Sequence, residues 1–336
     1  MQQLTVVYIM AWKNIKQRSL AESMVVIHDA VKELDELNEL INWSRVEGHL
    51  SHIHTKPRGE KAWPPLLMFK ALLLQSWYNL SDPQLEKQLA RDLLFRRFVE
   101  LDLSESVPDH STFWRFRQIL DRYDLLKKLL SEINQQLCEQ GLYIKSGEVS
   151  IVDASVIEAK QNRPNKNKEG GTTQDSEASW NVKNGSDGKQ KSTYGFKAHL
   201  NVDEDGLIKS TDYSSGNSHD SNHFTGLLSG QESAVYADSA YQSEKHHHWL
   251  SFRGIDNRLT IRAYRNRPLS EKARLFNRLH SGIRSVVERV FGVLKQHYGM
   301  EKARYLGLAR NRTRFELMCV AHNIKRGLSL QQGSYA

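Results

Sequence analysis

The stretch "SIVDASVIEA", residues 150–159, decides the fold that we expect for this chain. Its small and β-branched apolar residues are typical of a buried strand, but a single carboxylate, Asp153, lies among them. A carboxylate is costly to bury unless another group compensates its charge. We therefore expect a strand at these residues and a partner for Asp153 elsewhere in the chain.

The composition bounds the class of protein. The chain has 336 residues, 39% of them hydrophobic, and a formal net charge of +8, which favours a polyanionic partner such as nucleic acid. Cys138 and Cys319 belong to no CxxC pair, so neither a disulfide framework nor a cysteine zinc site is expected. No run approaches the roughly 20 apolar residues of a membrane helix. We expect a soluble cytoplasmic protein with no membrane partner.

The pattern of elements changes near residue 145. Residues 1–145 show helical periodicity throughout, which predicts an all-helical N-terminal domain. Residues 146–336 alternate strands with helices, and the order matches an RNase H-like domain of the α/β or α+β class. That fold has a mixed five-stranded sheet with flanking helices. The polar stretch 160–192 predicts a long, exposed and mobile loop.

Four further elements of the second domain are predicted from their patterns. A helix is expected over residues 220–229 and a strand over 258–264. The longest helix is expected over 270–298, before Gly299, and a final helix over 313–326.

Two carboxylates lie in strands that are expected to be neighbours in this sheet. Asp153 lies in the first strand, and Asp238 lies at the end of the fourth, in "VYADSAY". The inferred sheet makes these strands neighbours, and a shared divalent cation would relieve the repulsion between the two carboxylates. Hard oxygen ligands suit Mg²⁺ or Mn²⁺. Taken singly, Asp153 can be a strand-end residue and Asp238 a helix cap.

The long helix offers a third acid. At roughly 100° per residue, Arg284, Glu288 and Lys295 fall within about 40° of one another and share one polar stripe beside the apolar one. Glu288 can then lean over the edge of the sheet, with Arg284 and Lys295 placed to bind phosphate oxygens. Three such carboxylates can hold two divalent ions for an in-line phosphoryl transfer. Alone, Arg284 and Glu288 can be an ordinary surface ion pair.

A hairpin adds polar residues that we expect in the same cleft. In "YGFKAHLNVD", residues 194–203, Lys197 and His199 share one face of a strand, opposite Phe196 and Leu200. Both side chains are expected to contact phosphate.

Several long motifs together resemble those of a known family. They are "VDASVIEA", "YGFKAHLNVDEDGLI", "SSGNSHDSNHF", "VYADSAYQ" and "RSVVERVFGVLKQHYGMEKARYLGLARN". The chain resembles a bacterial insertion-sequence transposase of the DDE class, closest to insertion-sequence family five, over roughly residues 40–326. The resemblance implies Mg²⁺-dependent cleavage at inverted-repeat ends, strand transfer into target DNA, and Asp153, Asp238 and Glu288 as the catalytic and metal-binding triad. It implies that residues 1–145 bind DNA ends or mediate oligomerisation, in a nucleoid-associated protein that acts as a homodimer or higher homo-oligomer.

The same resemblance extends to neighbouring positions. Arg284, Glu288 and Lys295 match the spacing of the family's signature around its glutamate, whereas Ser281 stands where that signature has a tyrosine. The likeness around "NSHDSN" implies that His219 and Asp220 support the site.

Basic residues in both halves are candidates for DNA contacts. Arg115 and Arg117 lie in "HSTFWRFRQIL", which can form the second helix of a helix-turn-helix or can simply pack with solvated arginines. Arg304 belongs to a basic segment that would contribute phosphate contacts and salt-dependent affinity.

Two other functions remain open. One is a metal-dependent nuclease or resolvase on the same fold, which would cut DNA but not join it. The other is a catalytically silent DNA-binding protein derived from a transposase.

Overall fold

The computed structural model describes residues 12–13, 32–53, 61–142, 148–163, 172–184, 190–264 and 268–333. The chain forms two compact units, Met1–Leu129 and Leu130–Ala336, and each is considered by itself. The expected domain boundary, at residue 145, falls outside the described residues. The division between the units falls inside a helix (Leu125–Glu139).

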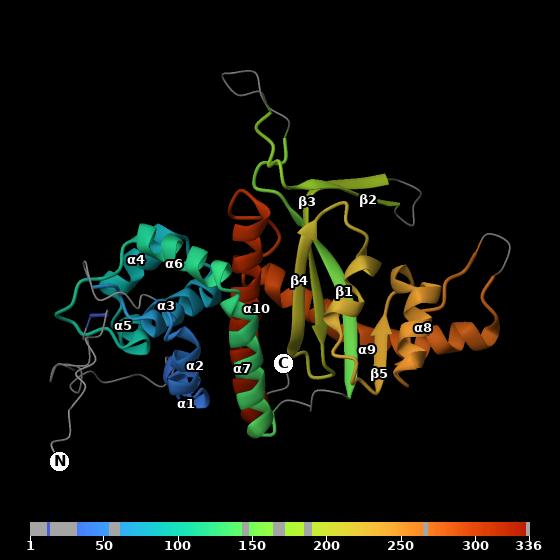
Figure 1. Cartoon of the computed structure of the whole chain (residues 1–336), viewed down its shortest axis with the longest axis horizontal. Helices are drawn as coiled ribbons and strands as arrows, with labels where there is room; N and C mark the ends of the chain where they lie inside the picture. Colours follow the sequence, from blue (N-terminus) through green and yellow to red (C-terminus); the bar gives the residue numbers. More distant parts are fainter. Residues whose placement is uncertain are drawn as a thin grey trace, which may run out of the picture. The chain divides into compact units, whose positions relative to one another are not determined.

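The first unit is helical, as predicted (Figure 1). Its central helix, Pro65–Trp77, is buried along nearly its whole length, which explains why its sequence is apolar on all sides. Even Lys70 is only 1% exposed, with its ammonium 2.7 Å from Glu100 Oε1. The helices are α1 Glu33–Leu40, α2 Trp43–Leu50, α3 Pro65–Trp77, α4 Asp82–Arg91, α5 Leu93–Val99, α6 His110–Arg122 and the start of α7 Leu125–Glu139.

The second unit is built on a mixed sheet. The strands are β1 Val149–Glu158, β2 Ser179–Asn184, β3 Gln190–Val202, β4 Ile208–Ser215, β5 Ala234–Ala237 and β6 Asp256–Asn257. β1 is central: it pairs antiparallel with β3 on one side and parallel with β5 on the other. β3 pairs antiparallel with β4, and β5 pairs parallel with β6. The order β4-β3-β1-β5-β6, with these directions, is RNase H-like and confirms the predicted topology.

The sheet has six strands, not five, because β2 forms inside the stretch predicted to be a loop. β2 pairs with the first half of β3, from Ser179 opposite Gly195 to Asn184 opposite Gln190. Its side chains Trp180 and Val182 remain half exposed, so the segment lacks the buried apolar face that predicts a strand. Backbone pairing forms this hairpin, and the prediction of an unbroken loop over 160–192 was wrong.

The strand expected over residues 258–264 is reduced to the two-residue β6. Arg258 and Thr260 still donate backbone hydrogen bonds to Val235 and Ala237 of β5. From Ile261 the backbone hydrogen bonds go to a side chain instead: Asn277 accepts from the Ile261 N–H (2.9 Å) and donates to its carbonyl (3.0 Å). The side-chain amide therefore replaces a neighbouring strand.

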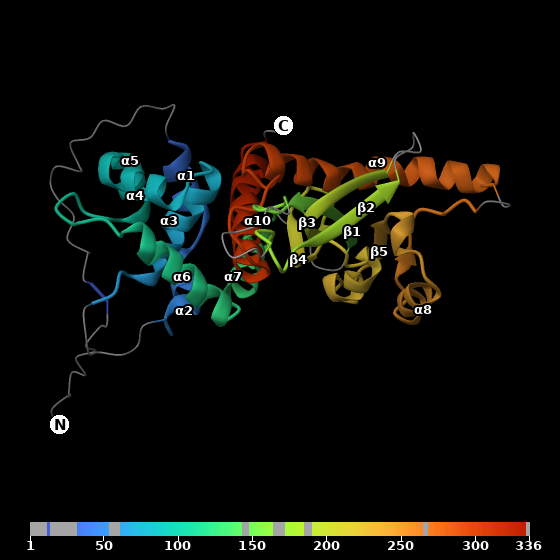
Figure 2. The same ribbon diagram turned by 90° about the horizontal axis from the view of Figure 1, so that it is seen from above.

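Two long helices cover one side of the sheet. α9, Glu271–Gln296, confirms the predicted longest helix, packs across β1, β3 and β5, and begins at the cap residue Ser270. α10, Leu308–Gln331, packs on β4 and is longer than the predicted 313–326. Figure 2 shows α9 and α8 on opposite sides of the sheet. No helix among the described segments is long and apolar enough to cross a membrane.

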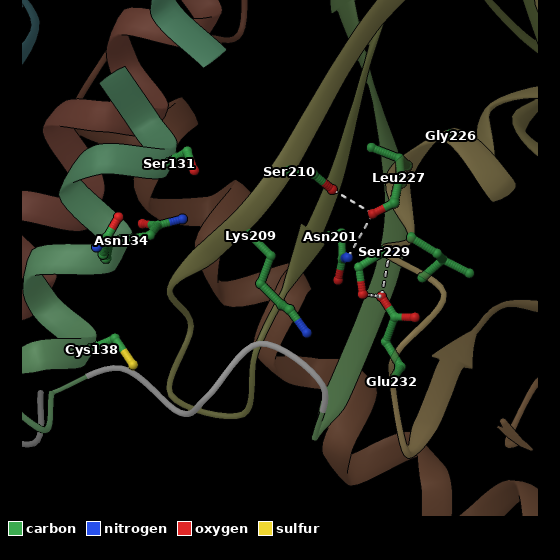
Figure 3. A pocket seen from close by; sticks show the side chains of 12 residues that line it. Ser131, Asn134, Cys138, Asn201, Lys209, Ser210, Gly226, Leu227, Ser229 and Glu232 are labelled. Carbon is green, nitrogen blue, oxygen red and sulfur yellow. Dashed lines mark hydrogen bonds between the residues drawn. The ribbon is translucent and has the colours of Figure 1, made fainter. Parts of the chain in front are cut away.

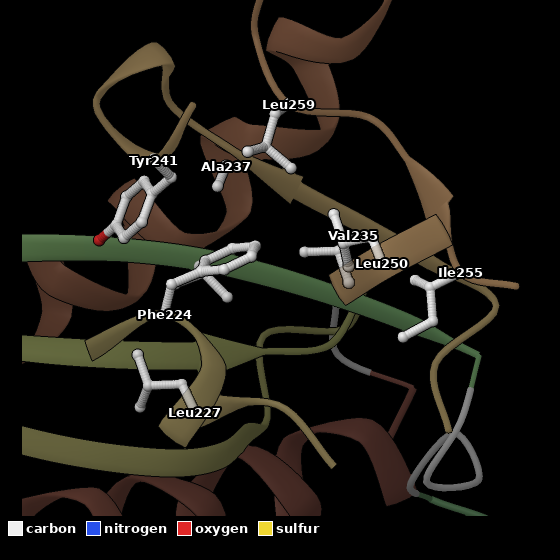
Figure 4. Packing of buried hydrophobic residues seen from close by; sticks show 9 residues of the cluster. Phe224, Leu227, Val235, Ala237, Tyr241, Leu250, Ile255 and Leu259 are labelled. Atoms are coloured by element: carbon white, nitrogen blue, oxygen red, sulfur yellow. The ribbon is translucent and has the colours of Figure 1, made fainter. Parts of the chain in front are cut away.

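The opposite face carries short elements around an apolar cluster (Figure 4). Instead of one helix over 220–229, the chain forms two 3₁₀ turns, η3 Asp220–His223 and η4 Thr225–Leu227. A third turn, η5 Ser239–Tyr241, leads to α8, Glu244–Phe252. The cluster consists of Val152, Phe224, Leu227, Val235, Ala237, Tyr241, Leu250, Ile255 and Leu259.

Candidate active site

Asp153 and Asp238 lie side by side at one edge of the ladder between parallel strands. The last paired residues of β1 and β5 are Val152 and Ala237, and the two aspartates follow them directly. Val152 and Ala237 face the apolar cluster, so side-chain alternation turns the next residues toward the α9 side. The sheet register therefore brings the two predicted carboxylates together.

Each aspartate also bonds to the backbone that follows it. Asp153 Oδ1 accepts from the N–H of Ala154 at 2.8 Å, and Asp238 Oδ1 accepts from the N–H of Ser239 at 2.6 Å, where η5 begins. The capping role considered for Asp238 is thus present, and it leaves the side chain 47% exposed.

Arg284 of α9 provides a cation beside this pair. Its Nη1 lies 4.0 Å from Asp238 Oδ1 and 3.3 Å from the Thr260 hydroxyl. The guanidinium is only 16% exposed, and its Nε is buried without a hydrogen-bond partner in the described part of the chain. An arginine in this position is suited to bind an anion that approaches the two aspartates.

Glu288 lies one turn after Arg284 and is exposed on α9, and Lys295 is partly exposed two turns further on. Across the described ranges, no three His, Cys, Asp or Glu side chains are gathered closely enough to hold a metal ion. Even without a third acid, Asp153 and Asp238 offer hard oxygen ligands of the kind that Mg²⁺ and Mn²⁺ take, and water would complete the coordination. The paired aspartates fit such an ion, while the contribution of Glu288 stays a prediction.

Tyr241 is a member of this region that the sequence analysis missed. Its side chain is 1% exposed, and its hydroxyl has no hydrogen-bond partner among the described residues. Burial raises the pKa of the phenol well above its usual value, and the negative charges of Asp153, Asp220 and Asp238 raise it further against the effect of Arg284. The hydroxyl is therefore protonated and acts as a donor. Its only sequence signal is its place three residues after Asp238.

His199, predicted to contact phosphate, is not placed beside the paired aspartates. Asp153 pairs with Leu200 of β3, whereas His199 pairs with Ala154, so His199 points to the other face of the sheet. Its ring is fully buried, lies 2.8 Å from the Ser214 hydroxyl and stacks on His223 with ring centroids 4.1 Å apart. Burial lowers its pKa to about 4, so the ring is neutral.

Lys197 and Asp220 bind each other instead of lining an open cleft. The Lys197 ammonium donates to Asp220 Oδ1 at 2.9 Å and to the Ser218 carbonyl at 2.7 Å, and Lys197 is 7% exposed. The ammonium expected to contact phosphate is thus bonded to residues 218 and 220 in this structure. The adjacent His219 is exposed and contacts Ser221 (2.9 Å).

The two arginines of α6 have different environments. Arg115 is exposed and donates to two hydroxyls of its own helix, those of Ser111 and Thr112, each at 3.1 Å. Arg117 is 6% exposed and is tied to Asp82 of α4 and to Gln75 of α3. Of the two arginines predicted to bind DNA, Arg117 is therefore buried, whereas Arg115 is accessible. Arg304, in the second unit, is partly exposed.

A separate cavity of about 420 Å³ opens between α7 and the β3–β4 hairpin (Figure 3). Lys209 extends into it and donates to the Val149 carbonyl and the Ser150 hydroxyl, both at 3.1 Å. The carboxylate of Glu232 faces it and is held by the Ser229 and Gly230 N–H groups. Neither Asp153 nor Asp238 lines this cavity, so it is distinct from the paired aspartates.

Comparison with known proteins gives two family matches. A family model described as "Transposase DDE domain" matches residues 144–324, which include Asp153, Asp238 and Glu288. A second, described as "Transposase domain (DUF772)", matches residues 24–119. Among solved structures, the chain is similar to one titled "Crystal structure of a pre-cleavage Mos1 transpososome". Identity is 8% and the TM-score is 0.20, over 87% of this chain and 86% of that chain, a similarity too low to support an argument.

Proposed function

Because this chain belongs to the family of transposases with a DDE domain, we propose that it cleaves DNA at the inverted-repeat ends of a transposable element and joins those ends to target DNA. The observation that carries the proposal is the placement of Asp153 and Asp238 directly after the last paired residues of the parallel ladder between β1 and β5, with Arg284 4.0 Å from Asp238. Carboxylates in such an arrangement suit metal-assisted phosphoryl transfer.

In this proposal Asp153 and Asp238 would hold Mg²⁺, or Mn²⁺ in its place, and Glu288 would complete the ligand set from α9. The three carboxylates together would hold two such ions. When bound, the ions activate water or a DNA 3′ hydroxyl and stabilise the leaving oxygen. Arg284 binds the non-bridging oxygens of the phosphate, and Lys295 binds the DNA backbone about three turns further along the helix.

DNA is the proposed partner because the chain carries a formal net charge of +8. Arg115 and Arg304 bind DNA phosphates, so the affinity for DNA falls as salt rises. The proposed substrates are the terminal inverted repeats and target DNA, and the proposed active form is a homodimer or larger homo-oligomer in the bacterial cytoplasm, at the nucleoid.

A two-stage assay tests the proposal. Labelled DNA that carries the inverted repeats flanking the coding region is incubated with the full chain and Mg²⁺, and cleavage products are measured. Pre-cleaved ends are then offered with a target plasmid. Cleavage with joining supports a transposase, cleavage without joining supports the nuclease or resolvase, and DNA binding without cleavage supports the silent DNA-binding protein. Glu288→Gln should abolish both stages, and full activity of that variant would remove Glu288 from the ligand set.

A further inference from the structure

Three polar side chains of the second unit, from β4, the loop after it and η3, form a hydrogen-bonded chain that the proposed function does not use. The Ser218 hydroxyl lies 2.8 Å from His223 Nε2, and His223 Nδ1 lies 2.6 Å from Asp212 Oδ2. A serine on one imidazole nitrogen, with a carboxylate on the other, is the arrangement that activates a serine for nucleophilic attack. None of the proposed metal ligands belongs to this chain of side chains.

The carboxylate of Asp212 fixes which nitrogen of the His223 ring carries the hydrogen. Burial raises the pKa of Asp212, but hydrogen bonds from His223 and from the Tyr213 N–H (2.8 Å) act against it, and the pKa is lowered overall. Because the ionised carboxylate can only accept, Nδ1 carries the hydrogen in the neutral ring and Nε2 accepts from the Ser218 hydroxyl. His223 Nε2 is therefore placed to take the hydroxyl proton.

A second histidine holds the His223 ring in this orientation. His199 stacks on it with ring centroids 4.1 Å apart and ring planes inclined by 21°. His199 is fully buried, and burial lowers its pKa to about 4, so it is neutral at pH 7. A neutral neighbour supports the ring by contact and does not repel the imidazolium that forms when His223 takes a proton.

Ser218 is held by its backbone, yet a small molecule can reach it. Its N–H donates to the Ser215 carbonyl at 3.1 Å, and its carbonyl accepts from the Lys197 ammonium at 2.7 Å. Ser218 and His223 remain partly exposed. The N–H of the next residue, His219, donates no backbone hydrogen bond within the described part of the chain. The amide after a nucleophilic serine is a common donor to the oxyanion of acyl transfer.

We propose that Ser218 is the nucleophile of a second, metal-independent catalytic site that hydrolyses small carboxylic esters, with His223 as general base and Asp212 as the carboxylate that orients it. Ser218 Oγ bonds to the carbonyl carbon while its proton passes to His223 Nε2. The bond from that carbon to the alcohol oxygen breaks, and His223 returns the proton to the leaving oxygen. Water, deprotonated by His223, then releases the carboxylic acid and restores the serine.

A covalent probe and an ester substrate test this proposal on the full chain in EDTA. A fluorophosphonate, which reacts with activated serines, should label the wild type, and peptide mass spectrometry should find the phosphonate on Ser218. Ser218→Ala should abolish labelling and reduce hydrolysis of p-nitrophenyl acetate to the uncatalysed background. Asp212→Asn should slow both reactions by about 10²–10⁴-fold, because the amide no longer holds the required tautomer.

Ser221→Ala is the matched control. The Ser221 hydroxyl also lies beside a histidine, 2.9 Å from His219 Nδ1, but no carboxylate contacts that ring among the described residues. Labelling and ester hydrolysis should therefore be unchanged in this variant.

The labelling site in the wild type needs no variant, so the test holds even where a substitution unfolds the chain. A wild type that stays unlabelled, or that is labelled at another residue, refutes the proposal. So does ester hydrolysis by folded Ser218→Ala or Asp212→Asn at the wild-type rate. Because EDTA removes divalent cations, none of these outcomes depends on metal-dependent DNA cleavage, and the proposed function stands or falls separately.

Discussion

Replacing Arg117 with methionine should destabilise the helical unit without acting through DNA. Arg117 joins three helices: its Nη2 lies 2.5 Å from Asp82 Oδ2 and its Nη1 donates to Gln75 Oε1 at 3.0 Å. Gln75 Nε2 in turn donates to Asp82 Oδ1 at 2.6 Å. The side chains of Arg117 and Asp82 are 6% and 15% exposed, so little water can replace the lost guanidinium.

The expected loss is about 3–5 kcal/mol in the free energy of unfolding, the usual cost of removing one partner from a buried ion pair. Urea denaturation followed by circular dichroism measures it. Arg117→Met combined with Asp82→Leu should recover most of the loss, because no charge is then left buried. Arg115→Ala, on the exposed side of the same helix, should change stability by less than about 0.5 kcal/mol.

The effects of these variants on DNA affinity should be the reverse of their effects on stability: Arg115→Ala should matter more than Arg117→Met. Arg115→Ala should weaken binding to the inverted-repeat DNA and reduce the slope of log affinity against log salt by about 1, as expected for one lost phosphate contact. The account of α6 is refuted if Arg117→Met leaves the unfolding free energy unchanged and instead lowers DNA affinity. In that case Arg117 would be a DNA-binding residue, as the sequence pattern first suggested.

Two further predictions concern stability. Gly195→Ala should cost ~3 kcal/mol or more, because the new Cβ would lie 1.9 Å from the Ile157 carbonyl oxygen, whereas Gly292→Ala, in open space on α9, should stabilise the chain by about 0.5–1 kcal/mol. Equal effects in urea denaturation would contradict the close packing of β1 against β3. Burial lowers the pKa of His322 to about 4. The stability that the neutral, buried imidazole contributes to the folded state is therefore fully present above the unfolded pKa near 6.5, and it is lost as the pH falls toward 4. Between pH 7 and pH 5, His322→Gln should lose about 2 kcal/mol less unfolding free energy than the wild type, and parallel pH profiles would show that the buried ring is not the cause.

The sequence predicted the central part of the site because that part depends on strand order. Once "VDAS" and "VYAD" are neighbouring parallel strands, Asp153 and Asp238 must lie near each other, and the register confirms this. Arg284 was placed correctly beside the pair by the helical stripe of α9.

The surroundings were less predictable, for physical reasons. Alternation in β3 separates Lys197 and His199 from Phe196 and Leu200, but it does not reveal which face meets the aspartates. The polar face is covered by the equally polar segment around residue 218, whose side-chain and backbone hydrogen bonds leave no apolar pattern to detect. Tyr241 was missed for a similar reason, since the burial of its hydroxyl depends on the surrounding fold and not on periodicity.

The central claim is that Asp153 and Asp238 act together in metal-dependent DNA cleavage. The direct measurement is the rate of Mg²⁺-dependent cleavage of labelled inverted-repeat DNA by the full chain and by Asp153→Asn and Asp238→Asn. Asp256→Asn is the matched control, because Asp256 of β6 is a half-exposed aspartate that forms an ion pair with Arg258. The account predicts that both site variants bind the DNA but do not cleave it, while the control cleaves at the wild-type rate. Cleavage by either site variant at the control's rate would contradict it.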